Sequence, residues 1–145
     1  MAITHKTAYV AQVCMGADMQ QLLTALTEAE QFDGPSLIIA YCPCIAHGYP
    51  MEQSLQRQKL AVDCGYWPLY RFHPTPTTQN TPSFHLDSKI KTNDFRAFLE
   101  GENRFRSLLQ TQPEIAERLF TELQRECLAN YELYQKLASE LKMDE

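Results

Sequence analysis

The sequence predicts an α/β fold with a short, mainly parallel sheet, followed by a helical C-terminal extension. Two observations carry this prediction. In the first half of the chain, short apolar and β-branched segments alternate with segments whose apolar residues recur every three or four positions. In the second half, a long helical pattern follows a proline-rich stretch. The chain has 145 residues, which is enough for one domain with a core of ordinary size.

The first unit expected along the chain is a strand, a helix and a second strand. Residues 7–13 are rich in β-branched and aromatic residues, and Gly16 follows at a natural turn. The next helix, opening at residues 17–20, carries an apolar stripe and ends before Gly34-Pro35. Residues 36–41 then form an apolar run that is typical of a strand buried on both faces. Short connections predict a right-handed βαβ unit with two parallel strands.

A second helix and a third strand follow. Residues 51–63 form the helix, with an apolar face made by Leu55, Leu60, Ala61 and Val62. Residues 66–72 read as a strand, and Pro68 places it at an edge or a bulge.

The remaining half of the chain changes character. Residues 73–82 contain three prolines and should form an extended surface loop before a short extended piece at 83–88. Asp94 is the expected N-cap of a helix that begins at Phe95 and continues past Gly101. The last and longest helix is expected from Pro113 to about Leu141.

Composition excludes several classes of function. The formal net charge is −5 and no stretch concentrates Lys and Arg, which argues against nucleic-acid binding. No apolar run approaches the ~20 residues that span a bilayer. The N-terminus lacks the layout of a signal peptide. Five cysteines, an odd number, argue for free thiols in a reducing cytoplasm.

The strongest chemical signal is the loop that follows the second strand. Cys42, Cys44 and His47 stand there in a C-x-C-x-x-H pattern, at the end of a strand where α/β folds collect ligands. Thiolate and imidazole suit zinc or an iron–sulfur cluster, but three ligands do not complete a structural site. Cys14 or His5 could add a ligand if the first strand ends alongside. Ordinary loop thiols are the alternative.

The other candidate residues have simpler interpretations. Cys14, Cys64 and Cys127 are expected to be core or near-core thiols. His73 and His85 flank the proline-rich loop without a nucleophile in a recognisable pattern, so no catalytic residue is predicted. The five glycines are isolated, which argues against a phosphate-binding loop.

Several segments, in order along the chain, closely resemble the C-terminal end of the pyruvate:ferredoxin (flavodoxin) oxidoreductases. The segments are Tyr9–Val13 with Met15-Gly16, Gly34–Tyr41, Cys44-Ile45, Gly65–Arg71 and Leu86–Lys89. The resemblance implies the C-terminal half of a thiamine-diphosphate-binding, three-layer α/β domain over residues 1–73. It leaves residues 74–145 as a proline-rich loop and helical extension.

The resemblance also implies a role for Cys44. The matching cysteine supplies one ligand to the [4Fe–4S] cluster nearest the thiamine diphosphate, and three cysteines of another segment supply the rest. Cys42 matches a position that need not be cysteine, and His47 matches no residue of assigned role. The resemblance implies that the parent enzymes oxidatively decarboxylate pyruvate, form acetyl-CoA from coenzyme A and pass the electrons to ferredoxin or flavodoxin.

The chain departs from the family in what it lacks. The Gly-Asp-Gly segment that holds Mg²⁺ and the diphosphate, the three partner cysteines and the glutamate-bearing domain have no counterpart here. The chain is therefore expected to be a fragment that is inactive alone, holds no cofactor by itself and needs the remaining part of the enzyme. The complete enzyme is expected to be a cytoplasmic homo-oligomer.

Two alternatives stay open. The chain could be a stand-alone interaction module or a degenerate remnant without redox activity. A small zinc site at Cys42, Cys44 and His47 is the other alternative.

Overall fold

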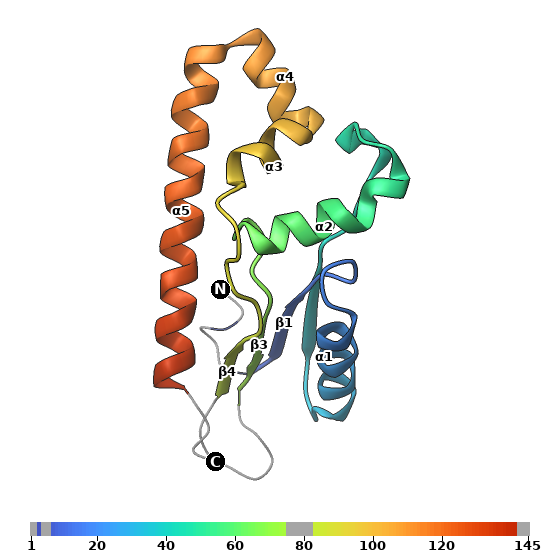
Figure 1. The fold of residues 1–145 in the computed structure, drawn as a ribbon. Helices are drawn as coiled ribbons and strands as arrows, with labels where there is room; N and C mark the ends of the chain where they lie inside the picture. The colour runs from blue at the N-terminus through green and yellow to red at the C-terminus, as the bar shows by residue number, and fades with distance from the viewer. Residues whose placement is uncertain (1–2, 4–6, 75–82, 142–145) are drawn as a thin grey trace.

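A computed structural model describes residue 3, residues 7–74 and residues 83–141. Four strands form one sheet in the order β2-β1-β3-β4. In chain order, the strands are β1 (Tyr9–Val13), β2 (Ser36–Ala40), β3 (Tyr70–His73) and β4 (Ser83–Leu86). The helices are α1 (Met19–Gln31), α2 (Ser54–Asp63), α3 (Phe95–Gly101), α4 (Asn103–Thr111) and α5 (Pro113–Glu140), with 3-10 turns η2 (Ile45–His47) and η3 (Met51–Gln53). The predicted α/β class with a helical C-terminal region is confirmed (Figure 1).

The predicted first unit is present. Strands β1 and β2 pair in parallel, with Tyr9 opposite Ser36 and Val13 opposite Ala40. Helix α1 connects them, and the Asp18 carboxylate accepts a 2.9 Å hydrogen bond from the Gln21 N–H as its N-cap.

The sheet is mixed, whereas the sequence indicated a mainly parallel one. Strand β3 runs antiparallel to β1, and β4 runs antiparallel to β3. The reason is the course of α2, which lies across the carboxyl ends of β1 and β2 (Figure 1). Trp67, just before β3, donates from its indole N–H to the Val13 carbonyl at 3.1 Å. The chain thus re-enters the sheet at the end where β1 stops, so β3 must run in the opposite direction.

The expectation that the second strand is buried on both faces is wrong for this structure. β2 lies at the edge of the sheet, and Leu37 is 44% exposed. Ile38 and Ile39 are only partly buried against the rest of the core. The apolar run predicts that both faces of this strand are covered, and the described residues cover them only in part.

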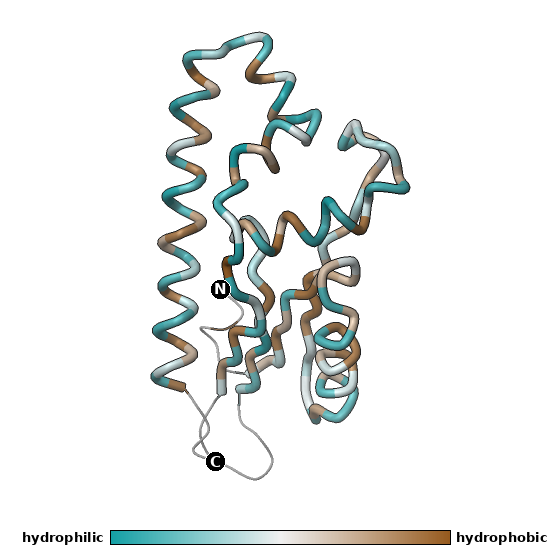
Figure 2. Tube along the Cα trace, in the orientation of Figure 1, coloured by the Kyte–Doolittle hydropathy of each residue, from teal (hydrophilic) through white to brown (hydrophobic). Residues whose placement is uncertain are grey.

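Two helices cover opposite faces of the sheet (Figure 1). On one face, Tyr9, Ala11 and Val13 pack with Ala25 of α1. On the other, Val10, Tyr70, Phe72 and Phe84 pack against the C-terminal part of α5. Figure 2 shows polar and apolar residues alternating turn by turn along α5, as its stripe pattern predicts. The prediction for the bounds of this helix agrees to within one residue.

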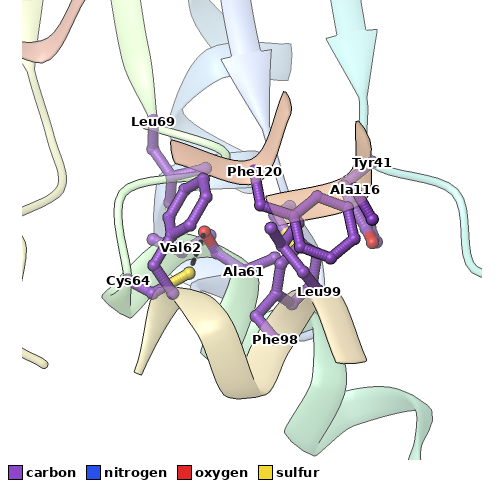
Figure 3. Packing of buried hydrophobic residues seen from close by; sticks show 11 residues of the cluster. Tyr41, Ala61, Val62, Cys64, Leu69, Phe98, Leu99, Ala116 and Phe120 are labelled. Atoms are coloured by element: carbon purple, nitrogen blue, oxygen red, sulfur yellow. Dashed lines mark hydrogen bonds between the residues drawn. The ribbon is translucent and has the colours of Figure 1, made fainter. Parts of the chain in front are cut away.

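The third core cluster lies beyond the carboxyl ends of β1 and β2 and joins α2, α3 and α5 (Figure 3). Its largest members include Phe98, Leu99 and Phe120, and Tyr41 packs into it from the end of β2. The predicted helix at 51–63 is a 3-10 turn followed by α2. Leu55, expected on its apolar face, is 59% exposed. The helix expected to continue past Gly101 divides into α3 and α4 at Glu102.

The predicted domain boundary at residue 73 stays a prediction. β4, which follows it, belongs to the same sheet as β1. Most of the proline-rich segment, residues 75–82, lies outside the described residues, as do His5 and residues 142–145. In the described ranges, no helix is both long and apolar enough to cross a membrane.

Two of the segments that carry the family resemblance, Gly65–Arg71 and Leu86–Lys89, meet in the sheet. Arg71 of β3 donates to Asp87, after β4, from Nε at 2.8 Å and from Nη2 at 3.0 Å. Arg71 also pairs with Glu28 of α1, whose other oxygen accepts from the Tyr9 hydroxyl at 2.7 Å. Burial alone would lower the pKa of Arg71, but hydrogen bonding and charge pairing with Asp87 and Glu28 raise it. This network fixes α1 against β3.

Replacing Asp87 by Ala should destabilise the fold by about 1.5–3 kcal/mol, because it leaves the half-buried Arg71 with one carboxylate fewer. Urea unfolding measures the change. Lys89→Ala, an exposed position two residues away, is the matched control and should change stability by less than about 0.5 kcal/mol. Equal losses in both variants would contradict the importance of the pair.

Candidate functional site

The Cys42–His47 loop begins where β2 ends. The Tyr41 N–H donates to the Val13 carbonyl at 3.0 Å, which is the last bond that ties this segment to β1. Beyond it, the thiols of Cys42 and Cys44 are both exposed. The predicted position of Cys44, just beyond the carboxyl end of a strand, is thus found in the structure. Its role as a ligand stays a prediction.

The loop is ordered by its own backbone around Cys44. The His47 N–H donates to the Cys44 carbonyl at 3.0 Å, forming the 3-10 turn η2. The Ala46 N–H donates to the Cys44 sulfur at 3.4 Å. The turn that begins at Cys44 therefore also contacts the Cys44 sulfur through its backbone.

The structure does not bring the other predicted ligands together with Cys44. The described residues contain no group of three or more His, Cys, Asp or Glu side chains suited to a metal ion. The zinc alternative at Cys42, Cys44 and His47 therefore has no preformed site in that part of the chain. His47 instead faces Tyr49 and Glu102, with its Nδ1 3.1 Å from the Tyr49 hydroxyl.

Cys14 does not extend the site. The ends of β1 and β2 do lie alongside each other, as that possibility required. Cys14 itself is fully buried, and its thiol faces the side-chain carbonyl of Gln58 at 3.6 Å. Cys64 is also buried, while Cys127 is partly buried against the same cluster. These three are structural thiols, as expected.

Burial raises the pKa of the Cys14 thiol to about 11. The unfolded chain ionises this thiol near its ordinary pKa of about 8.5, so the unfolded state loses its proton first. The contribution of Cys14 to stability is therefore complete below about pH 8.5 and lost as the pH rises to about 11.

The free energy of unfolding of the wild-type chain should accordingly fall between pH 8.5 and about 11, in part by this route. Cys14→Ala should be less stable at neutral pH but lose stability less steeply in this range. Cys42→Ala, at an exposed thiol, should keep the wild-type slope. Urea titrations at half-unit pH steps measure both, and parallel pH profiles for wild type and Cys14→Ala would contradict the assignment.

A buried polar group that the sequence did not indicate lies beside the loop. Glu102, at the corner between α3 and α4, has no exposed surface. Arg57 of α2 pairs with its Oε1 at 3.1 Å, and His47 Nδ1 lies 3.4 Å from its Oε2. Gly101 makes this possible, because a Cβ there would lie 2.3 Å from both terminal nitrogens of Arg57. That glycine inside a helical pattern was the only sequence signal for a close approach.

Tyrosines line the same region. Desolvation and the charge of Glu102 raise the pKa of Tyr41 and of Tyr49. Both hydroxyls therefore stay protonated at neutral pH and can donate hydrogen bonds. The thiol of Cys44 is thus exposed, while Tyr41, Tyr49 and Glu102, which is paired with Arg57, lie buried beside the loop.

Comparison with known proteins gives a consistent set of relatives. The chain is 50% identical over 138 residues to a pyruvate:ferredoxin oxidoreductase of Moorella thermoacetica, and the match covers 95% of the chain and 12% of that enzyme. It is 44% identical over 142 residues to a pyruvate-flavodoxin oxidoreductase of Klebsiella pneumoniae. A mitochondrial pyruvate dehydrogenase [NADP(+)] of Euglena gracilis is 37% identical over 139 residues, which are 8% of its length.

No family model matches the chain. It spans about an eighth of the length of the oxidoreductases, since the match covers 12% of each of these. Over nearly its whole length, the chain is therefore homologous to one segment of the pyruvate:ferredoxin and pyruvate-flavodoxin oxidoreductases.

Proposed function

We propose that this chain is a C-terminal portion of a pyruvate:ferredoxin (flavodoxin) oxidoreductase and that Cys44 is one ligand of its [4Fe–4S] cluster nearest the thiamine diphosphate. One observation carries the proposal. Cys44 presents an exposed thiol just beyond the carboxyl end of β2, in a chain that is 50% identical over 138 residues to such an enzyme.

The donor set near Cys44 fits a cluster only as a single ligand. A [4Fe–4S] cluster takes four thiolates, and the described residues hold no second thiol, imidazole or carboxylate pair that completes a site. The other three ligands therefore come from elsewhere in the complete enzyme. When bound, the cluster supplies one-electron transfer. The Ala46 N–H, 3.4 Å from the Cys44 sulfur, would tune its potential by hydrogen bonding.

The uncovered apolar surfaces support a larger assembly. Leu37 at the open edge of β2 is 44% exposed, and the outer face of α1 carries Met19, Leu23 and Leu26, which are 50%, 51% and 47% exposed. These three residues lie on one stripe of the helix. A strand edge without a partner among the described residues and an exposed apolar stripe are each typical of a surface that another chain segment covers.

In the proposed enzyme, the remaining part of the protein holds the thiamine diphosphate with its Mg²⁺, binds pyruvate and coenzyme A, and passes electrons to ferredoxin or flavodoxin. Residues 1–73 complete the thiamine-diphosphate-binding α/β domain, and residues 74–145 form its extension. This chain contributes Cys44 and the helices behind it. The complete enzyme works in the cytoplasm as a homo-oligomer.

A chimaera tests the proposal. The matching segment of the Moorella thermoacetica oxidoreductase is exchanged for this chain, and pyruvate- and coenzyme A-dependent reduction of a viologen dye is measured. We expect activity in the chimaera, none in the enzyme lacking the segment and none in this chain alone. Activity of the chain alone, or of the enzyme without the segment, would contradict the proposal. The latter result would favour the alternative of a stand-alone interaction module or remnant.

A further inference from the structure

Glu102 is a buried carboxylate that needs a charged or hydrogen-bonding partner. Its backbone N–H donates to Leu99 at 3.0 Å and ends α3, and its carbonyl accepts from Phe105 and Arg106, each at 3.0 Å, and begins α4. The residue has no exposed surface. A carboxylate removed from water in this way is tolerated only with a charged or hydrogen-bonding partner.

Arg57 provides the first partner. Its Nη2 lies 3.1 Å from Glu102 Oε1 and donates to the Phe98 carbonyl at 2.6 Å. The guanidinium also lies over the rings of Phe98 and Tyr49, at 5.3 and 5.6 Å from their centres. These contacts tie α2 to the α3–α4 corner and hold the charge of Glu102 in place.

The second partner comes from the loop that carries Cys44. Glu102 Oε2 has no hydrogen bond in this structure, and His47 Nδ1 lies 3.4 Å from it. Nδ1 is shared between this oxygen and the Tyr49 hydroxyl, which is 3.1 Å away. Glu102 therefore offers an acceptor to His47, which follows Cys44 by three residues along the chain.

The backbone of the loop approaches the same corner. Gly48 has a φ of +81°, and a Cβ there would meet the Cβ of Asn103, the first residue of α4, at 2.8 Å. Within the described residues, the hydrogen bonds of Cys44, Ala46 and the His47 backbone are local to the loop. The loop therefore reaches the α3–α4 corner through His47 and Gly48, beside the aromatic contacts of His47 with Tyr41 and of Tyr49 with Arg57.

We propose that Glu102 is the positioning residue of the Cys44 loop. One buried carboxylate joins α2 through Arg57, the α3–α4 corner through its own backbone and the loop through His47. It sets where the Cys44 sulfur stands relative to the core. The inference about the loop stands on the structure, and its meaning for a cluster rests on the proposed function.

Hydrogen exchange of the whole chain tests the positioning. In Glu102→Gln, we expect the Ala46 and His47 amides to exchange about tenfold faster or more, because the carboxylate charge that lies 3.4 Å from His47 Nδ1 is lost. The amides of Val10 and Ala11 in β1 should exchange at the wild-type rate. Glu100→Gln removes an exposed carboxylate that pairs with Arg96 at 2.6 Å on the same helix, and it should leave the loop unchanged.

A second pair of variants keeps the test decisive if Glu102→Gln does not fold. The His47 side chain is 17% exposed, whereas the Glu102 side chain is fully buried. Replacing His47 therefore disturbs the interior less than replacing Glu102. His47→Ala should accelerate exchange of the Ala46 amide, and His47→Gln, which keeps an N–H donor, should restore slow exchange. Wild-type exchange in the loop of both Glu102→Gln and His47→Ala would overturn the proposal.

The chimaera separates this proposal from the function. There, Glu102→Gln should change the electron paramagnetic resonance spectrum of the cluster without lowering its iron content. Glu100→Gln should not. Faster loop exchange together with a cluster that is indifferent to loss of the Cys44 thiol would leave the positioning role standing and overturn the ligand role. Unchanged loop exchange together with a cluster that requires the Cys44 thiol would overturn the positioning role and leave the ligand role standing.

Discussion

Cys44→Ser in the oxidoreductase chimaera should abolish pyruvate-dependent dye reduction and remove about four iron atoms per protomer, which is the content of one [4Fe–4S] cluster. A serine hydroxyl is nearly isosteric with the thiol, but it is not ionised at neutral pH and is a poor ligand for a soft metal site. Because Cys44 is exposed and its sulfur accepts a hydrogen bond from the Ala46 N–H of its own loop, the change should leave the fold intact. Iron analysis and steady-state assays measure the outcome.

Cys42→Ser is the matched control. Cys42 lies two residues away, is also exposed, and has a thiol that faces the Pro43 carbonyl beside it at 3.6 Å. It should keep full iron content and turnover. Normal iron content and turnover in Cys44→Ser would contradict the ligand role. Loss of iron in both variants would point to a disturbed loop and not to one ligand.

Arg57→Leu should destabilise the chain by about 3–5 kcal/mol, the largest effect on stability expected here. Glu102 has no exposed surface, so removal of Arg57 leaves a carboxylate in the interior without its cationic partner. The change also leaves the Phe98 carbonyl without the donor that lies 2.6 Å away. Since net stabilities of small domains are only about 5–15 kcal/mol, Arg57→Leu should unfold at a much lower urea concentration than the wild type.

Lys59→Leu is the control for the loss of a positive charge on α2. Lys59 is 55% exposed, and its ion pair with Asp63 should contribute only about 0.3–0.5 kcal/mol. The double variant Arg57→Leu/Glu102→Leu separates charge from packing, because it removes both members of the pair. It should recover part of the loss. If the double variant is less stable than Arg57→Leu alone, the cost arises from packing and not from the unpaired carboxylate.

The sequence was sufficient for those elements whose packing is local. The β1-α1-β2 unit follows from periodicity and from the Gly34-Pro35 stop, and α5 follows from a stripe that repeats over 28 residues. The direction of β3 could not be predicted in the same way. The residues of a strand indicate how deeply it is buried but not which way it runs. Its direction depends on α2 crossing the strand ends, which is a tertiary effect.

The same distinction between local and tertiary effects applies to the candidate site. The position of Cys44 follows from one local fact, the end of an apolar strand. Glu102 could not be found by such reasoning, because its sequence neighbourhood resembles any polar helix end. Its burial arises from Arg57, 45 positions earlier, and from a glycine that lets the guanidinium approach. Charged residues acquire such positions only through contacts between distant segments.

The two edges of the sheet differ, and the difference limits how copies of the chain can associate. On β4, the Phe84 N–H already donates to the Leu141 carbonyl at 3.2 Å, at the C-terminal end of α5. On β2, no strand of the described ranges pairs with the outer edge. Edge-to-edge pairing through β2 alone joins β2 to β2 about a twofold axis and then stops. Self-association through the β2 edge should therefore yield closed pairs and not filaments, and a strand from the rest of an enzyme would compete for that same edge.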